Sequence, residues 1–274
     1  MSLMWKLSTA AIAATLLANA SFDLESYVRK DLVKNPRVKV NRVELIGKKE
    51  LKDHKNWSAY MFMIDLEMGK KKDKFADMVF INEKEGLATQ KLYDYKTHKD
   101  LGQDIRPEIG DKYYRDDHLI AGKKDAKHKI VVFSDPECPF CRQNVPEIYK
   151  TVKENPDTFA LYYYHMPLRI HPSADALTRI MEVLQKQGKF DKVIKVYDTK
   201  VTYNEKNETK ILDTINKELG ENITLEEIKK PEYKKRVEED KEMAIKVMLK
   251  GTPTVYIDGK FQRDIKSYKK LIKK

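Results

Sequence analysis

Residues 129–141 read KIVVFSDPECPFC, and this stretch decides how the second half of the chain folds. The apolar run Ile130–Phe133 is typical of a buried strand, and the residues SDPE after it are typical of a turn. Cys138 and Cys141 follow directly, and apolar residues with helical spacing continue to residue 152. The sequence therefore predicts a strand, a turn and a helix that begins at a C-x-x-C pair.

Cys138 is predicted at a position that favours its thiolate, the form of cysteine that attacks a disulfide. At a helix N-terminus, free backbone N–H groups and the positive end of the helix dipole stabilise an anion. Pro139 suits the first helical turn because its φ is fixed and it has no N–H to lose. We expect Cys138 to attack and Cys141 to resolve the mixed disulfide. The loop between the two cysteines is too short to constrain the unfolded chain much, so the pair suits switching better than stapling.

The residues beside the cysteines tune the reduction potential, because whatever stabilises the Cys138 thiolate stabilises the reduced pair. Pro139 and Phe140 bring no charge. We therefore expect a moderately oxidising pair within the range of about −270 to about −120 mV that such motifs span. Asp135 and Glu137 would raise the pKa of Cys138 if their carboxylates lay close. The sequence leaves open whether the helix or the carboxylates dominate.

A half zinc site is the main alternative for the cysteine pair, because structural zinc needs about four ligands. The chain has 2 cysteines, so His128, His165 and His171 would have to complete the site, and they show no ligand spacing. We therefore predict no metal and no cofactor. His165 and His171 are expected in loops, Ser173 as a helix N-cap, and Tyr162–Tyr164 as core residues of a strand.

The rest of the second half predicts a domain with inserted helices. A Gly-Thr-Pro-Thr loop at 251–254 precedes a strand, and a tight turn, a partner strand and a terminal helix follow it. Strands are expected at 129–134, 159–165 and 255–257, with helical segments between the last two at about 172–186, 190–198, 208–219 and 231–249.

The first half predicts a smaller α+β unit, one helix on an antiparallel sheet. The helix is expected at 22–33, and the strands at 38–46, 57–68, 75–81 and 87–95. The charged segment 104–127 is the predicted domain linker, and its residues 111–121 are expected to form a linking helix.

Residues 1–20 have the composition of a secretory signal peptide. Lys6 precedes an apolar run at 7–17, and Ala18-Asn19-Ala20 suits cleavage after Ala20. The run is shorter than the ~20 apolar residues that span a bilayer. An uncleaved amphipathic anchor is the alternative, whereas attachment through a lipidated N-terminal cysteine is not expected because no cysteine lies near Ala20. We expect export to the periplasm.

The charge of the chain excludes few partners by itself. Its 54 Lys and Arg against 43 Asp and Glu leave a net charge of +11, spread along the sequence as on a solvated surface. Nucleic-acid binding usually needs a basic stripe interleaved with aromatic residues or a recognisable module. The sequence has neither, so we predict no nucleic-acid partner.

Residues 133–141, FSDPECPFC, together with Thr252-Pro253 far downstream, resemble the periplasmic disulfide isomerases of the DsbC/DsbG family, and DsbG most. The resemblance implies an α+β protein whose C-terminal thioredoxin-like domain, 128–274, carries a helical insert at 171–250. It also implies an N-terminal cystatin-like dimerisation domain at 21–103. Pro253 would be cis, and the backbone of Thr252 would hold an extended substrate peptide. DsbG has tyrosine at the position of Phe140, so substrate specificity does not follow.

We therefore expect a periplasmic thiol-disulfide oxidoreductase of the isomerase or reductase type. It would act as a homodimer on unfolded or misoxidised exported proteins and be kept reduced by a membrane redox partner. A dimeric oxidase, reoxidised by a membrane quinone-linked partner, is the first alternative, and the redox state of the cysteines in cells separates the two. A non-enzymatic holdase chaperone and a metal-delivery protein are the alternatives from other classes.

Overall fold

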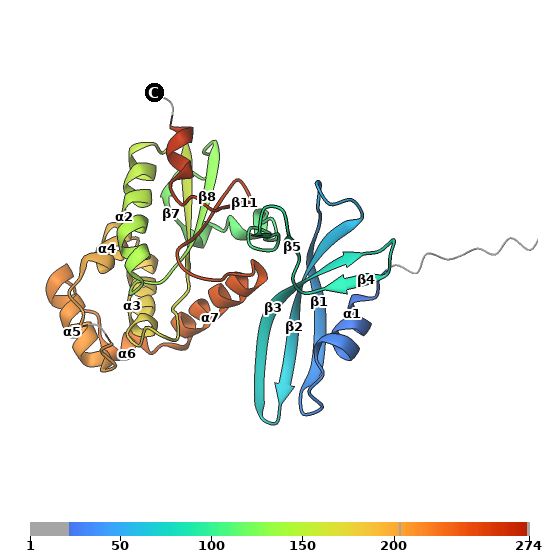
Figure 1. Ribbon diagram of the computed structural model, residues 1–274. Helices are drawn as coiled ribbons and strands as arrows, with labels where there is room; N and C mark the ends of the chain where they lie inside the picture. The colour runs from blue at the N-terminus through green and yellow to red at the C-terminus, as the bar shows by residue number, and fades with distance from the viewer. Residues whose placement is uncertain (1–21, 203, 273–274) are drawn as a thin grey trace, which may run out of the picture.

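A computed structural model gives the structure of residues 22–202 and 204–272. The predicted signal peptide, 1–20, lies outside the described residues. The described chain forms two α+β units, each with its own sheet, that lie side by side (Figure 1). None of the described helices combines the length and the apolar character that a membrane span requires.

The N-terminal unit is a four-stranded antiparallel sheet with a short helical segment against one face, as the sequence predicted (Figure 1). The helical segment is α1, Leu24–Tyr27, continued by a π-helical turn, Val28–Leu32. Gly69 has a φ of +61°, which the tight turn between the second and third strands requires. The strands are β1, Lys39–Glu50; β2, Trp57–Met68; β3, Lys71–Asn82; and β4, Leu87–Thr89. A small ribbon of β5, Tyr93–Asp94, and β6, Lys99–Asp100, follows.

The C-terminal domain is built on a five-stranded sheet with the order β11-β10-β8-β9-β7. Its strands are β7, Leu119–Gly122; β8, His128–Ser134; β9, Phe159–His165; β10, Thr254–Ile257; and β11, Lys260–Gln262. The central pair β8 and β9 is parallel, and β10 runs antiparallel to β8. Since side chains alternate along a strand, Tyr163 joins the core on the face covered by helix α2, Pro139–Glu154, while Tyr162 and Tyr164 join the core on the other face.

The predicted helical insertion lies between β9 and β10. One of its helices, 208–219, has strong signals at both ends: the Asn207 side chain accepts from two backbone N–H groups at its start, and Gly220 ends it with φ +61°. The helices are α3, Ala174–Lys186; α4, Phe190–Lys195; α5, Glu208–Leu219; α6, Leu225–Ile228; and α7, Pro231–Lys246. Two 3-10 turns, Val196–Asp198 and Ser267–Leu271, follow α4 and end the described chain.

The linking helix predicted at 111–121 is wrong. This segment forms two 3-10 turns, Asp111–Tyr113 and Asp116–His118, and then strand β7. Strand β7 pairs with the free edge of β9 and buries Ile120, so the end of the predicted linker is part of the C-terminal sheet. Edge pairing with a distant strand outweighs the local helical pattern, which is a weak signal over so few residues.

The two units contact each other through α7 and the loop that follows it. Met248 packs with Met61 and Met78, which point from the first sheet toward the C-terminal domain. Lys74 on β3 forms an ion pair with Glu242 on α7 at 2.9 Å. The helical insertion therefore supplies the surface on which the N-terminal unit rests.

Replacing Gly122 with alanine should destabilise the C-terminal sheet strongly. Gly122 has a φ of +78°, and a Cβ there would lie 1.9 Å from the carbonyl oxygen of Phe159. Left-handed strain and overpacking together should lower the free energy of unfolding by at least about 2 kcal/mol in urea titrations. Gly188→Ala is the matched control, because Gly188 has a φ of +69° with open space around it and should lose only about 1 kcal/mol. Equal losses would mean that the close approach of β7 and β9 is not a constraint.

Candidate active site

The C-x-x-C pair lies at the junction of β8 and α2, as predicted. Cys138 is the N-cap of α2 with φ −65° and ψ 122°, and Pro139 opens the helix. The Cys138 thiol donates to the carbonyl oxygen of Thr252 at 3.2 Å. This contact brings together two motifs that are 114 residues apart in sequence. The Thr252-Pro253 peptide bond is cis.

The two cysteines have different surroundings. Cys138 is 6% exposed and Cys141 is fully buried, whereas Phe140 between them is 67% exposed. The sulfurs are not bonded to each other. An incoming group therefore meets the Phe140 ring and the Cys138 sulfur, while Cys141 is reached only from inside the protein.

The electrostatics favour the thiolate at Cys138. A hydrogen bond from the Cys141 thiol is the largest cause that lowers the pKa of Cys138 to about 5. Burial of Cys138 opposes this, while the Thr252 side chain and the backbone N–H groups of Cys141 and Phe140 add to the stabilisation of the thiolate. Burial raises the pKa of the Cys141 thiol, and its interaction with Cys138 raises it further. The negative charge is therefore directed to Cys138, the sulfur that is closer to solvent.

The sequence left open whether Asp135 and Glu137 or the helix dominate at Cys138; the pKa of Cys138 is lowered, and both carboxylates accept hydrogen bonds from backbone N–H groups. Asp135 is fully buried; its Oδ1 accepts from the N–H groups of Glu137 at 2.7 Å and Cys138 at 3.2 Å. Its Oδ2 accepts from the N–H of Leu168 at 2.7 Å and lies 2.8 Å from His171 Nδ1. Asp135 thus fastens the turn before α2 to the loop after β9.

His171 and Ser173 lie where the sequence predicted, in the loop and at the helix N-cap, but their partners were not predicted. His171 is buried against Asp135. Ser173 is at the N-cap of α3, but its hydroxyl donates to the carbonyl of Glu205, and its N–H donates to Glu137 Oε2 at 2.8 Å. The side chains of Asp135 and Glu137, just before the cysteines, therefore hold the backbone of the loop after β9 and the start of α3 in place. The sequence offered no signal for these contacts because the two segments lie more than 30 residues from the acidic side chains.

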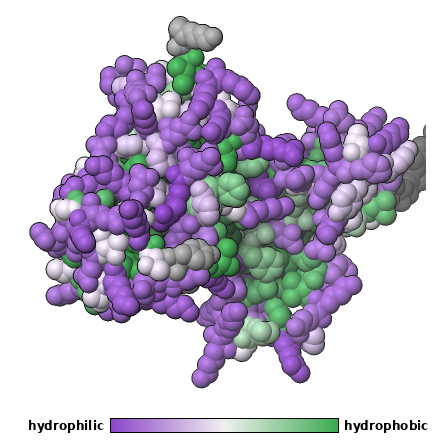
Figure 2. All heavy atoms as spheres, turned by 60° about the vertical axis from the view of Figure 1, so that its left-hand side comes forward, coloured by the Kyte–Doolittle hydropathy of each residue, from purple (hydrophilic) through white to green (hydrophobic). Residues whose placement is uncertain are grey.

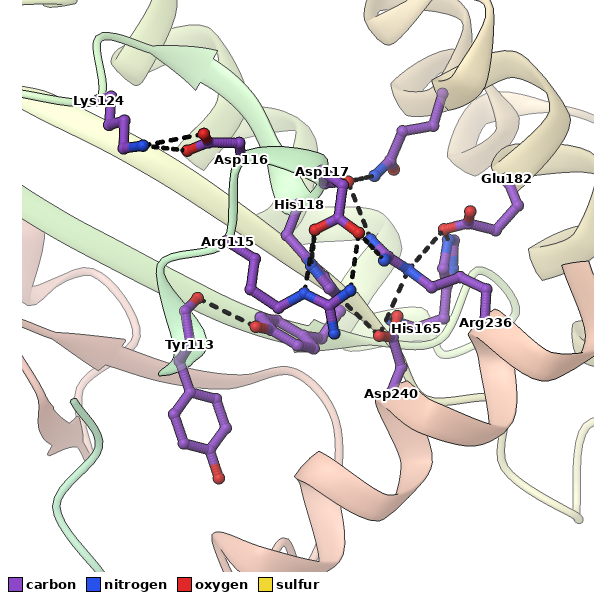
Figure 3. Close-up of polar contacts among 12 residues, drawn as sticks. Tyr113, Arg115, Asp116, Asp117, His118, Lys124, His165, Glu182, Arg236 and Asp240 are labelled. Atoms are coloured by element: carbon purple, nitrogen blue, oxygen red, sulfur yellow. Dashed lines mark hydrogen bonds and ion pairs between the residues drawn. The ribbon is translucent and has the colours of Figure 1, made fainter. Parts of the chain in front are cut away.

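A buried ionic cluster behind the site was missed entirely from sequence. His165 is the fully buried last residue of β9, inside the predicted strand 159–165 and not in the loop after it, and its Nε2 lies 3.0 Å from Glu182 Oε1. Asp240 Oδ2 accepts from the His165 N–H at 2.8 Å. His118 Nε2 lies 2.8 Å from Asp240 Oδ1. Figure 3 shows these side chains converging with Arg236 from β9, α3, α7 and the turn before β7.

Arg236 supplies positive charge to this cluster. Its Nε lies 3.5 Å from Glu182 Oε1 and 3.7 Å from Asp240 Oδ1. Burial raises the pKa of Glu182, but His165 and Arg236 outweigh it and leave that pKa lowered. His165, Glu182 and Asp240 are metal-ligating residue types within 4.8 Å of one another, and the guanidinium beside two of them neutralises their charge within the protein.

The amino-acid sequence is similar to a protein family and to proteins from other organisms. The sequence matches the protein-family model described as Thioredoxin over residues 115–274. It is 31% identical over 167 residues to the probable disulfide bond formation protein D of Bacillus cereus, covering 56% of this chain and 76% of that protein. A protein of the same name from Bacillus anthracis is 29% identical over 195 residues, covering 64% of this chain and 88% of that protein.

The fold also resembles a solved structure. Oxidised BdbD from Bacillus subtilis has a TM-score of 0.50 and 19% identity, and the match covers 61% of this chain and 94% of that one. At this identity the likeness concerns the fold alone. The α+β, thioredoxin-like character expected of the C-terminal domain is therefore confirmed.

The lowered pKa of Cys138 predicts the pH dependence of its alkylation. The rate at which the reduced protein reacts with iodoacetamide should be half-maximal near pH 5, and Cys141→Ala should move the midpoint upward because it removes the largest cause of the shift. Mass spectrometry across pH 3 to 10 measures this, with Cys138→Ser as the control for reaction at the other thiol. Because the pKa is lower in the folded state, Cys138 also stabilises the reduced protein at high pH, and this contribution is lost as the pH falls through about 5. A wild-type midpoint near the ordinary value of about 8.5 would contradict the assignment.

Removal of the Arg236 charge should destabilise the C-terminal domain. Arg236→Met leaves two buried carboxylates without their nearest fixed cation, which should lower the free energy of unfolding by about 3–5 kcal/mol. Lys235→Met is the matched control on the next residue, whose exposed pair with Glu239 should contribute less than about 1 kcal/mol. Urea unfolding of both variants gives the comparison, and a loss for Arg236→Met as small as that for Lys235→Met would show that the cluster does not depend on the guanidinium.

Proposed function

Because the chain belongs to the thioredoxin family matched over residues 115–274, we propose that it is a thiol-disulfide oxidoreductase whose net reaction is the donation of a disulfide to client proteins. The single observation that carries the direction is the pKa of Cys138, lowered to about 5 at the start of α2. A stabilised thiolate favours the reduced pair and so makes the oxidised pair a strong disulfide donor. The names of the two Bacillus relatives, disulfide bond formation proteins, support the same direction.

The proposed reaction has two exchange steps. In the oxidised protein, a client thiolate attacks Cys138 Sγ, a bond forms between the client and Cys138, and the bond to Cys141 breaks with its electron pair on Cys141 Sγ. A second client thiolate then attacks the client sulfur of the mixed disulfide, and Cys138 leaves as its stabilised thiolate. The client gains a disulfide, and the pair is left as one thiolate and one thiol.

Thr252 and Pro253 are proposed to hold the client peptide during these steps. The Thr252 carbonyl lies against the Cys138 thiol at 3.2 Å, and β10 begins directly after Pro253. A peptide laid along residues 251–253 would place its cysteine at the attacking distance from Cys138. Phe140 and Ile170, 67% and 73% exposed, are apolar surfaces beside this path that suit unfolded clients.

The hollow between the two units is proposed to receive more of the client. A cleft of about 760 Å³ opens there, with apolar residues from both units on its walls: Leu66, Met166, Pro167, Leu168 and Ile245. Figure 2 shows apolar side chains gathered where the two units meet, on a surface that is otherwise largely hydrophilic. Leu168 is the residue whose N–H binds Asp135, so the cleft adjoins the loop that supports the cysteines.

The isomerase or reductase function remains as the second candidate, and this cleft is the observation that favours it. Rearranging a wrong disulfide requires prolonged contact with a misfolded client, for which a cleft with apolar and charged walls next to the loop that supports the cysteines offers a surface. The location in the periplasm, the homodimer formed through the N-terminal unit and a membrane redox partner belong to the same proposal. For a disulfide donor this partner would be an oxidant, and for an isomerase it would be a reductant.

The reduction potential of the pair tests the proposed direction. Equilibration of the purified chain with glutathione and trapping of free thiols should give a value near the oxidising end, about −120 mV, and the oxidised protein should form a disulfide in a reduced two-cysteine peptide. Cys138→Ser should abolish both reactions. A value near −270 mV would overturn disulfide donation. A pair found reduced in cells would favour the isomerase, and a Cys138→Ala, Cys141→Ala variant that kept full function in cells would favour the holdase.

A further inference from the structure

Three buried hydroxyl groups form a chain behind the C-x-x-C pair. The Ser134 Oγ lies 2.6 Å from the Tyr197 hydroxyl, and the Tyr163 hydroxyl lies 2.6 Å from the same atom. Ser134 ends β8, Tyr163 is on β9, and Tyr197 is in the 3-10 turn after α4. Ser134 and Tyr163 are fully buried and Tyr197 is 1% exposed, so these hydroxyls depend on one another and on their protein neighbours for hydrogen bonds.

The chain of hydroxyls ends at the sulfur of Cys141. Hydrogen bonding by the Ser134 hydroxyl lowers the pKa of the Cys141 thiol against the larger effect of burial, and Cys141 packs in the same core as Tyr163 and Tyr197. A charge on Cys141 also acts on both tyrosines, which places their hydroxyl groups near the sulfur. The hydroxyls are therefore associated with Cys141.

Thiol-disulfide exchange creates a charge at this buried place. When a thiolate attacks Cys138 in the disulfide, the electron pair of the breaking bond goes to Cys141 Sγ. In the opposite direction, Cys141 must lose its proton before its sulfur can attack Cys138. Cys141 is fully buried, and an anion out of contact with water is costly unless donors surround it.

We propose that Ser134, Tyr197 and Tyr163 form a hydrogen-bond relay that stabilises the Cys141 thiolate during exchange. Ser134 touches the sulfur and is the catalytic member, and the two tyrosines are positioning residues that act through it. The proposal rests on the proposed function of the pair, and it assigns to this chain a device that neither the C-x-x-C motif nor the cis-proline loop contains.

The number of hydroxyl hydrogen atoms allows each hydroxyl to donate toward the Cys141 sulfur. Each hydroxyl carries one donor, so if Tyr163 donates to Tyr197 and Tyr197 donates to Ser134, the hydrogen of Ser134 is left for the sulfur. Hydrogen bonds in such a chain polarise one another, which makes the last donor stronger than an isolated serine. When Cys141 is a thiol, the Ser134 oxygen is free to accept from it after the chain reorients.

The test measures the reactions of the two cysteines one after the other. Reduced protein is mixed with dithiobisnitrobenzoate, an aromatic disulfide that releases a coloured thiolate. Cys138 attacks the reagent and releases one coloured thiolate. Cys141 then attacks Cys138 Sγ in the mixed disulfide and releases the other. Stopped-flow absorbance therefore gives one rate for each cysteine in the same experiment.

Tyr197→Phe keeps the ring and removes the hydroxyl that links the relay. We expect the second phase to slow about tenfold, as for a buried hydroxyl that loses its hydrogen-bond partner, because Ser134 is then no longer held and polarised by Tyr197, and the first phase to stay unchanged. Ser134→Ala should slow the second phase at least as much. The alkylation midpoint of Cys138 should stay near pH 5 in Tyr197→Phe, because the donors to Cys138 remain.

Tyr164→Phe is the matched control. Tyr164 is also a buried tyrosine of β9, but its hydroxyl donates to the carbonyl of Tyr113 at 3.0 Å on the opposite face of the sheet. This variant should lose stability without slowing either phase. A second phase that is as fast in Tyr197→Phe as in wild type, or slowed equally in Tyr164→Phe, would overturn the relay. Failure of the wild type to release both coloured thiolates would instead overturn the proposed function.

Discussion

The carboxylate of Asp135 accepts hydrogen bonds from the turn before α2 and from the loop after β9, and it does so with no exposure to solvent. These contacts set the direction in which α2 leaves the sheet, and thereby the place of Cys138 opposite Thr252. A buried carboxylate is costly when it lacks partners. With a full set of donors, it holds two separate segments in one arrangement, and the cysteine pair takes its position from them.

The site directs negative charge to one sulfur and away from the other. Cys138 is near the surface at a helix N-terminus, where the Cys141 thiol and backbone N–H groups lower its pKa. Cys141 is only three residues further along, yet burial raises its pKa. The two pKa values differ because the cysteines are one helical turn apart. The first turn of α2 places its N-cap, Cys138, near the surface and Cys141 in the core. The relay that we propose compensates for burial only where exchange places a charge on Cys141.

Besides the contacts of Asp135, two sets of polar groups in the interior of the C-terminal domain meet along β9. The hydroxyls of Ser134, Tyr163 and Tyr197 adjoin the cysteines, and the ionic cluster around Arg236 lies at the end of the strand. Tyr163 and His165 are two residues apart on β9. Their rings pack edge to face with 4.9 Å between the ring centres, which connects the two sets. Replacing either set with apolar side chains would remove costly buried polar groups, so their presence is better explained by a requirement for defined geometry at the site.

The sequence by itself determined the strand-turn-helix around residues 129–141, the inserted helices, the α+β character of both units and the cysteines with Thr252 and Pro253 as the candidate site. These are local patterns: hydrophobic periodicity, a proline after Cys138, and one motif with a known spacing. Only the tertiary structure decided that residues 119–122 join the C-terminal sheet, that His165 and His171 are buried, and that Asp135 binds backbone. It alone brought Ser134, Tyr163 and Tyr197 to Cys141 and Arg236 to Glu182 and Asp240. The physical reason is that these partners come from separate strands and helices, and a linear pattern records which face a residue takes but not which distant polar group will meet it there.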